Sequence, residues 1–284
     1  MNSRGNKHSR NHVSLNPNKD SAFWEFTYYE MAVYDLPAVI DYIKLKTGKE
    51  KITYFGHSQG TMQVFVGMSV LPEYFNNSLN GVIALGPVTY LTNIGSSFLA
   101  LVARTRLDYM LYYMGMREFL PSFKAINELS VILCEKLHII CSGILELIAD
   151  SNPGDDDQEK FGVFLGHFPS GTSLKDLSHF AQAVRDKTFA RYDYGASKNS
   201  EIYGQDTPPS FDLTKIQNKV CLFVGKDDKL ATVADNRALK GTLEQIGNLV
   251  WYEEIDKMGH LTFFIPTDFS YNENVMKCLE EFEK

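Results

Sequence analysis

The chain of 284 residues is long enough for one α/β domain with a sizeable insertion, or for two small domains. Hydrophobic residues make up 44% of it and charged residues 22%, which is ordinary for a globular protein and excludes a disordered or fibrous chain. The formal net charge of −7 argues against a nucleic-acid partner, because neutralising phosphates requires a basic surface.

The cysteines and the acidic residues offer no metal-binding pattern. Cys134, Cys141, Cys221 and Cys278 are too few and too scattered for a disulfide scaffold, and no CxxC pair suggests zinc. Cys221 lies in an apolar run, and we interpret it as a buried thiol. The acidic run at 155–157 lacks the spacing of a calcium loop, and no glycine-rich phosphate loop is present. We therefore expect neither a metal ion nor another cofactor.

The N-terminal sequence MNSRGNKHSRNH is polar and basic, so we expect no secretory signal there. A second segment, from Asn80 to Ala103, carries no charge and invites comparison with a membrane span. Pro87, Asn93 and Gly95 interrupt this run, so a buried strand followed by a loop explains it better than a transmembrane helix.

The first part of the chain alternates between helical and strand patterns. Apolar side chains recur at helical spacing over residues 23–47, and Pro37 predicts a kink there. Residues 51–55 predict a short strand that runs into the sequence GHSQG, and residues 61–71 predict a helix. Residues 81–85 are typical of a buried strand.

From about residue 88 to residue 209 the pattern is mostly helical and rich in Met, Tyr and Phe. Beyond it, strands and helices alternate again, at 220–224, 232–246, 249–255 and 272–283. This alternation implies a parallel sheet, and the middle block indicates a cap inserted into it. We expect a first part of the core over residues 1–87, a helical cap over 88–209 and a second part of the core over 210–284.

The sequence GHSQG at 56–60 matches G-x-S-x-G and lies between a predicted strand and a predicted helix. A sharp strand-to-helix turn would project the Ser58 hydroxyl above the sheet, and side chains at Gly56 or Gly60 would collide with the neighbouring strand and helix. The turn would also aim the Gln59 backbone N–H and the helix start at a developing oxyanion. The pentapeptide alone is common, but both flanks favour Ser58 as a nucleophile over a chance match.

A serine nucleophile needs a histidine base and an acid, and in an α/β-hydrolase the chain order is serine, then the acid, then the histidine. Gly225, Asp227 and Asp228 follow the next-to-last predicted strand. We favour Asp228 over Asp227 as the acid, because a glycine three residues earlier gives the turn room; a solvated turn is the alternative reading. His260 follows the last predicted strand and is the expected base. His57 fills the variable position of the pentapeptide, and we expect it to pack or hydrogen-bond locally.

Several stretches of this sequence, in the same order, resemble the acid lipase family. They are RGNKHSRNH (4–12), EMAVYDLPAVIDYI (30–43), GHSQGT (56–61), HFPSGTS (167–173), AQAVRDKTFARYDYG (181–195), and KDDKLAT and GHLTFF near the C-terminus. The resemblance covers nearly the whole chain and is more specific than the pentapeptide alone.

The resemblance implies an α/β-hydrolase fold whose helical cap screens a serine esterase site. It implies hydrolysis of neutral-lipid esters, such as triacylglycerols or cholesteryl esters, at a lipid–water interface in a lysosomal or secreted setting. Ser58, Asp228 and His260 would form the catalytic triad, and Gln59 would support the oxyanion. No stable protein partner is expected. The cap side chains that we expect to wall the cleft above Ser58 are Phe98, Leu101, Tyr112 and Phe119.

In the acid lipases, the segment that would precede Asn2 holds further strands and an HG loop with a second oxyanion N–H. Since residues before 51 predict one helix and no strand, we expect this chain to lack the N-terminal strands of the fold. Two alternatives to a lipase stay open, and the missing strands favour the second of them. One is an esterase for smaller, more soluble esters, and the other is a truncated remnant with impaired catalysis.

Overall fold

The computed structural model describes the chain except for residues 122–142, 144–145, 147 and 152–155. Within the described residues, a parallel sheet has the strand order β1-β2-β5-β6. The strands are β1 (Ile52–Ser58), β2 (Leu79–Pro87), β5 (Val220–Gly225) and β6 (Leu249–Ile255). The predicted α/β class and parallel sheet are confirmed, although β1 continues through the GHS residues to Ser58.

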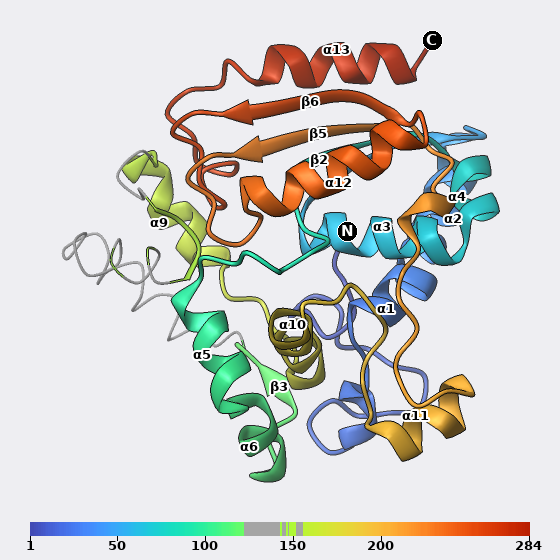
Figure 1. Cartoon of the computed structure of the whole chain (residues 1–284), viewed down its shortest axis with the longest axis vertical. Helices are drawn as coiled ribbons and strands as arrows, with labels where there is room; N and C mark the ends of the chain where they lie inside the picture. The colour runs from blue at the N-terminus through green and yellow to red at the C-terminus, as the bar shows by residue number, and fades with distance from the viewer. Residues whose placement is uncertain (122–142, 144–145, 147, 152–155) are drawn as a thin grey trace.

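Helices cover both faces of this sheet, as Figure 1 shows. They include α2 (Leu36–Thr47), α3 (Gln59–Val70), α4 (Pro72–Ser78), α12 (Val233–Gln245) and α13 (Asn272–Phe282). Alternate residues of the inner strands point to opposite sides. Val82, Ala84 and Leu222 join the larger core with α2, α3 and α12. Ile83 and Phe223 point to the other face and pack with α13.

The helix predicted over residues 23–47 is interrupted. Its segments are η1 (Ser21–Trp24), α1 (Tyr28–Glu30), the π-helical turn η2 (Met31–Asp35) and α2. Thr27 is extended and caps α1, because its hydroxyl accepts the Tyr29 N–H at 3.1 Å, while the Glu30 carboxylate accepts the Thr27 backbone N–H at 2.7 Å. The irregularity expected at Pro37 takes the form of the π turn just before α2, since proline has no N–H to continue the α-helical ladder.

The middle of the chain departs from the alternation of strands and helices, as predicted. Its described elements are α5 (Ser97–Thr105), α6 (Leu107–Tyr113), β3 (Glu118–Phe119), α9 (Gln158–His167), β4 (Thr172–Ser173), α10 (Leu174–Asp186) and α11 (Ala196–Tyr203). Strands β3 and β4 pair antiparallel as a separate ribbon. Figure 1 places α9 near the end of the sheet to which the strand arrows point, and α5, α6 and α10 farther from the sheet.

A separate apolar cluster joins α5 to α10. Its buried members are Val102, Ala103, Leu174, Leu177 and Ala181. Three of the four side chains expected to wall the cleft, Phe98, Tyr112 and Phe119, pack against this cluster. The fourth, Leu101, is 55% exposed. Their expected position above Ser58 stays a prediction.

The interpretation of Cys221 as a free buried thiol is wrong. Cys221 forms a disulfide with Cys278, which joins β5 to α13 across a sequence separation of 57 residues. Both side chains point into the core on the α13 face of the sheet, which brings their Cα atoms to 6.6 Å. Cys134 and Cys141 lie outside the described residues.

The uncharged run from Asn80 to Ala103 forms most of β2, a loop and most of α5. The buried strand followed by a loop that the sequence predicted is therefore confirmed. Across the part of the chain that the structure describes, no helix has both the length and the apolar character needed to cross a membrane.

Candidate active site

Ser58 lies at a sharp turn between a strand and a helix. It is the last residue of β1, and α3 begins at the next residue. Its backbone has φ 53° and ψ −123°, an uncommon conformation for a residue with a Cβ. Thr61 secures the turn, because its hydroxyl donates to the Ser58 carbonyl at 2.6 Å and accepts the Val88 N–H at 2.8 Å. The strand–turn–helix context predicted for the pentapeptide is present.

The two glycines of the pentapeptide differ in how much they are constrained. A Cβ on Gly56 would lie 2.8 Å from the Tyr54 ring and 3.2 Å from the Gly60 carbonyl carbon, so this position has no room for a side chain. A Cβ on Gly60 would meet only the Tyr54 hydroxyl, at an ordinary 3.6 Å. The expected collision is confirmed for Gly56 and wrong for Gly60, because the nearest atom to a Cβ on Gly60 is at an ordinary contact distance.

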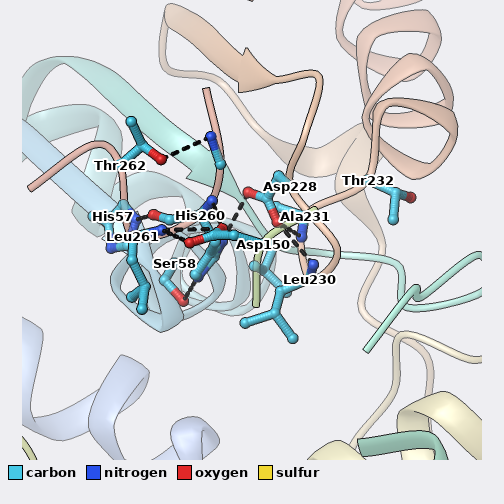
Figure 2. A network of polar contacts seen from close by, with 12 residues as sticks. His57, Ser58, Asp150, Asp228, Leu230, Ala231, Thr232, His260, Leu261 and Thr262 are labelled. Atoms are coloured by element: carbon cyan, nitrogen blue, oxygen red, sulfur yellow. Dashed lines mark hydrogen bonds and ion pairs between the residues drawn. The ribbon is translucent and has the colours of Figure 1, made fainter. Parts of the chain in front are cut away.

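Three side chains from separate strand ends form one hydrogen-bonded line (Figure 2). The Ser58 Oγ lies 2.6 Å from His260 Nε2, and His260 Nδ1 lies 2.8 Å from Asp228 Oδ2. A carboxylate can only accept, so Nδ1 donates to Asp228 and Nε2 accepts the Ser58 hydroxyl proton. This arrangement orients the imidazole as a base toward Ser58, which is the geometry that the chain order predicted.

Asp228, and not Asp227, faces His260. Its second oxygen, Oδ1, accepts the backbone N–H groups of Leu230 at 2.7 Å and Ala231 at 2.6 Å, which fix the carboxylate. Gly225 allows the acid loop to meet the histidine loop, because a Cβ there would lie 2.2 Å from the Met258 carbonyl oxygen. Glycine is thus needed three residues before the acid because the backbones of the two loops approach closely there.

The pKa values of the two neighbouring histidines, His57 and His260, are shifted in opposite directions. Burial lowers the pKa of His57 to about 3, and the charge of His260 adds to this effect. His57 is therefore neutral, and its Nε2 donates to the His260 carbonyl at 2.8 Å, a contact across 203 residues rather than a local one. For His260, burial lowers the pKa, but the attraction and hydrogen bond of Asp228 outweigh it, with help from Asp150, so the net shift is upward.

The Gln59 backbone N–H lies at the first residue of α3, where helix N–H groups have no intrahelical acceptor. The side chain of Gln59 is anchored by the middle of the chain, since its Nε2 donates to Asp176 Oδ2 at 2.8 Å. Asp176 is buried at the start of α10, and burial raises its pKa to about 7, a shift that Gln59 and Thr172 partly oppose. This hydrogen bond fixes the position of Gln59, whose backbone N–H would face an oxyanion.

Two carboxylates close to this site, Asp150 and Asp176, were not found from the sequence. Asp150 accepts the backbone N–H groups of His260 and Leu261, and it belongs to the run DSNPGDDD, which is typical of a solvated loop. Asp150 lies in no recognisable motif, and the S-x-x-D pattern of Ser173 and Asp176 marks the start of α10 but not a site. Among the described residues, no group of three His, Cys, Asp or Glu side chains is arranged to hold a metal ion.

The fold and the site together define a class, the α/β-hydrolases with a serine nucleophile elbow, and comparison with known proteins agrees. A family model for the alpha/beta hydrolase fold matches residues 1–266. The solved structure of a thermostable carboxyl esterase from Bacillus coagulans aligns with a TM-score of 0.50 at 15% identity, covering 91% of this chain and 72% of that one. At this identity the likeness supports the fold alone.

Curated relatives narrow the class. The lysosomal acid lipase/cholesteryl ester hydrolase of Homo sapiens is 36% identical over 270 residues, which cover 94% of this chain and 66% of that protein. The gastric triacylglycerol lipase of Rattus norvegicus is 35% identical over 286 residues, covering 99% and 71%. The chain therefore belongs to the α/β-hydrolase fold family and, within it, to the acid lipases. It spans about two thirds of the length of these relatives.

Proposed function

We propose that this protein hydrolyses carboxylic esters of neutral lipids, triacylglycerols or cholesteryl esters, through a serine acyl-enzyme. The observation that carries the proposal is the line of hydrogen bonds from Ser58 through His260 to Asp228, at 2.6 and 2.8 Å. The substrate class follows from the names of the two relatives, one a cholesteryl ester hydrolase and the other a triacylglycerol lipase. The lipid–water interface, rather than a protein, is the expected partner.

In the acylation step, Ser58 Oγ attacks the ester carbonyl carbon while His260 Nε2 takes the hydroxyl proton. The carbonyl oxygen becomes an oxyanion that the Gln59 N–H and the N-terminus of α3 stabilise. His260 then gives its proton to the leaving alcohol oxygen as the ester C–O bond breaks. Asp228 holds the imidazole in the tautomer that accepts from Ser58 and stabilises the imidazolium.

In the deacylation step, a water molecule replaces the alcohol. His260 removes a proton from this water, whose oxygen attacks the acyl carbon, and then returns the proton to Ser58 Oγ as the acyl bond breaks. The products are a fatty acid and the free hydroxyl of Ser58, so the cycle needs no cofactor.

Residues 88–209 act in this proposal as a cap on a core made of residues 1–87 and 210–284. Support comes from two contacts of this block with the site: Asp176 bonds to Gln59, and Asp150 bonds to the backbone of the histidine loop. An acyl chain needs an apolar cleft, which a helical layer rich in aromatic residues can supply.

The test is reaction with a fluorophosphonate probe, together with hydrolysis of long-chain and short-chain esters. We expect the wild-type protein to be labelled and to release fatty acid from triolein or cholesteryl oleate. Ser58→Ala should abolish both, and Ser197→Ala, at an exposed serine of α11, should change neither. Hydrolysis of short esters alone would favour an esterase, and absence of labelling in the folded protein would favour an inactive remnant.

The same relatives suggest where the protein acts. One is named as lysosomal and the other as gastric, so we propose a lysosomal or secreted location for the protein to which this sequence belongs. Fractionation of cells and medium with an antibody to this chain would test it. Recovery mainly in the cytosol would count against the proposal.

A further inference from the structure

A short segment of the middle block pairs with the loop that carries the acid. The Lys229 N–H donates to the Ala149 carbonyl at 2.8 Å, and the Ser151 N–H donates to the Asp227 carbonyl at 2.8 Å. These two bonds place Asp150 opposite Asp228 in an antiparallel bridge. The backbone on both sides of Asp228 is therefore held by residues 149–151.

The side chain of Asp150 holds the second loop of the site. It is fully buried, and its carboxylate accepts the backbone N–H of His260 and, at 3.2 and 3.3 Å, that of Leu261 (Figure 2). Gly259 makes this approach possible, because a Cβ there would lie 2.5 Å from the Asp150 carboxyl. Residues 149–151 thus bind the loop of Asp228 through backbone hydrogen bonds, and the Asp150 side chain binds the loop of His260.

We propose that Asp150 is a positioning residue for the catalytic base: it keeps the His260 loop in register with Asp228 and places a second carboxylate beside the imidazole. The effect on rate rests on the proposed ester hydrolysis, whereas the effect on His260 does not. A displacement of about 1 Å of a catalytic group can lower turnover by about 10²-fold. A nearby negative charge also stabilises the imidazolium that forms in each transition state.

The charges around Asp150 determine in which direction Asp150 shifts the pKa of His260. Burial raises the pKa of Asp150 to about 7, the His260 charge and backbone N–H lower it, and the carboxylates Asp228 and Asp156 raise it. His57, the other titratable side chain packed on His260, is neutral. When ionised, Asp150 favours the protonated form of His260 and raises its pKa. Removing the charge should therefore lower the pKa of His260.

The decisive measurement does not depend on catalysis. His260 would be titrated by NMR in protein labelled with ¹³C-histidine, with its signal assigned by its loss in His260→Gln. We expect Asp150→Asn to move the titration midpoint to lower pH by about one pH unit. Asp108→Asn, which changes a buried carboxylate of the same block bonded to Ser178 instead, should leave the midpoint unchanged. A wild-type midpoint in Asp150→Asn would overturn the proposal.

Kinetics test the positioning role. Asp150→Ala should lower kcat by about 10- to 100-fold with little change in KM, because the base and not the substrate is displaced. Asp150→Asn keeps one acceptor, so its kcat should fall less, and the acid limb of its kcat/KM profile should move to lower pH because neutral His260 persists further into acid. If Asp150→Ala does not fold, Asp150→Asn decides the question.

The failures of the two proposals can be told apart. A folded wild-type protein that hydrolyses no ester would refute the proposed function, while the NMR titration would still decide the influence of Asp150 on His260. An active wild type in which Asp150→Asn shares its kcat and pH profile would refute only the role of Asp150.

Discussion

Gly225 is the position where one added methyl group should disturb the site without touching a reacting atom. A Cβ there would lie 2.2 Å from the Met258 carbonyl oxygen, 2.9 Å from its carbon and 3.3 Å from the Gly259 oxygen. A normal carbon–oxygen contact is about 3.3 Å. Gly225→Ala therefore requires the acid loop and the histidine loop to separate by roughly 1 Å.

This separation acts on the hydrogen bond between Asp228 and His260, because Met258 lies two residues before His260 and Gly225 three residues before Asp228. A shift of about 1 Å in a catalytic group can lower turnover by about 10²-fold. Forcing a methyl group into a packed site also destabilises a fold, typically by about 1–3 kcal/mol. We expect Gly225→Ala to show both losses, with kcat falling more than the change in KM.

The assay is ester hydrolysis and the rate of fluorophosphonate labelling, with thermal unfolding followed in parallel. The matched control is Gly241→Ala in the interior of α12, where a Cβ would meet nothing within 4 Å. That change should raise stability by about 0.5–1 kcal/mol and leave the labelling rate unaltered. Wild-type labelling by a folded Gly225→Ala protein would refute the argument that close approach of the two loops sets the geometry.

Three further changes test separate parts of the structure. Cys221→Ser removes the disulfide to α13 and should lower the free energy of unfolding by about 2–4 kcal/mol in denaturant titrations, and unchanged stability would count against the bond. Gly56→Ala should abolish fluorophosphonate labelling whereas Gly60→Ala retains it, since only Gly56 lacks room for a Cβ; equal labelling of the two variants would contradict this. Burial raises the pKa of Asp176 to about 7, above its usual value of 3.8. The contribution of Asp176 to the free energy of unfolding is therefore present in full below about pH 3.8 and is lost as pH rises through about 7. Asp176→Asn should therefore flatten the pH dependence of unfolding between about pH 4 and 7, by up to about 1.4 kcal/mol per pH unit, and an unchanged slope would contradict that.

The positions of Ser58, Asp228 and His260 could be predicted because each lies at, or shortly after, the carboxyl end of a strand of one parallel sheet. The carboxyl ends of parallel strands lie at the same edge, so three residues far apart in sequence are brought together by the topology alone. The local patterns also sufficed to choose Asp228 over Asp227, since the glycine three residues earlier marks a close approach. The catalytic roles of these residues stay a proposal.

Other features depend on packing between elements that no local pattern links. Cys221 has the surroundings of a buried thiol in the sequence, and its pairing with Cys278 follows only from the packing of α13 on that face of β5. Gly60 is a similar case, because whether a Cβ there would collide depends on which atoms pack beside it in the folded chain. The break in the first predicted helix did have a local signal, since Thr27 and Glu30 form a capping box.

Asp150 shows most clearly why the site extends beyond the three predicted residues. A buried carboxylate is unfavourable unless its oxygens find donors. For Asp150 those donors are the backbone N–H groups of the loop that carries His260, 110 residues away. Backbone donors leave no trace in residue identities, so the sequence around His260 does not point to the acid. The same bonds couple the middle block to the base, because a movement of residues 149–151 must either carry the loops of Asp228 and His260 with it or leave the Asp150 carboxylate without its donors. The hydrogen-bond geometry among Ser58, His260 and Asp228 should therefore depend on the packing of residues 149–151, which supply none of these three side chains.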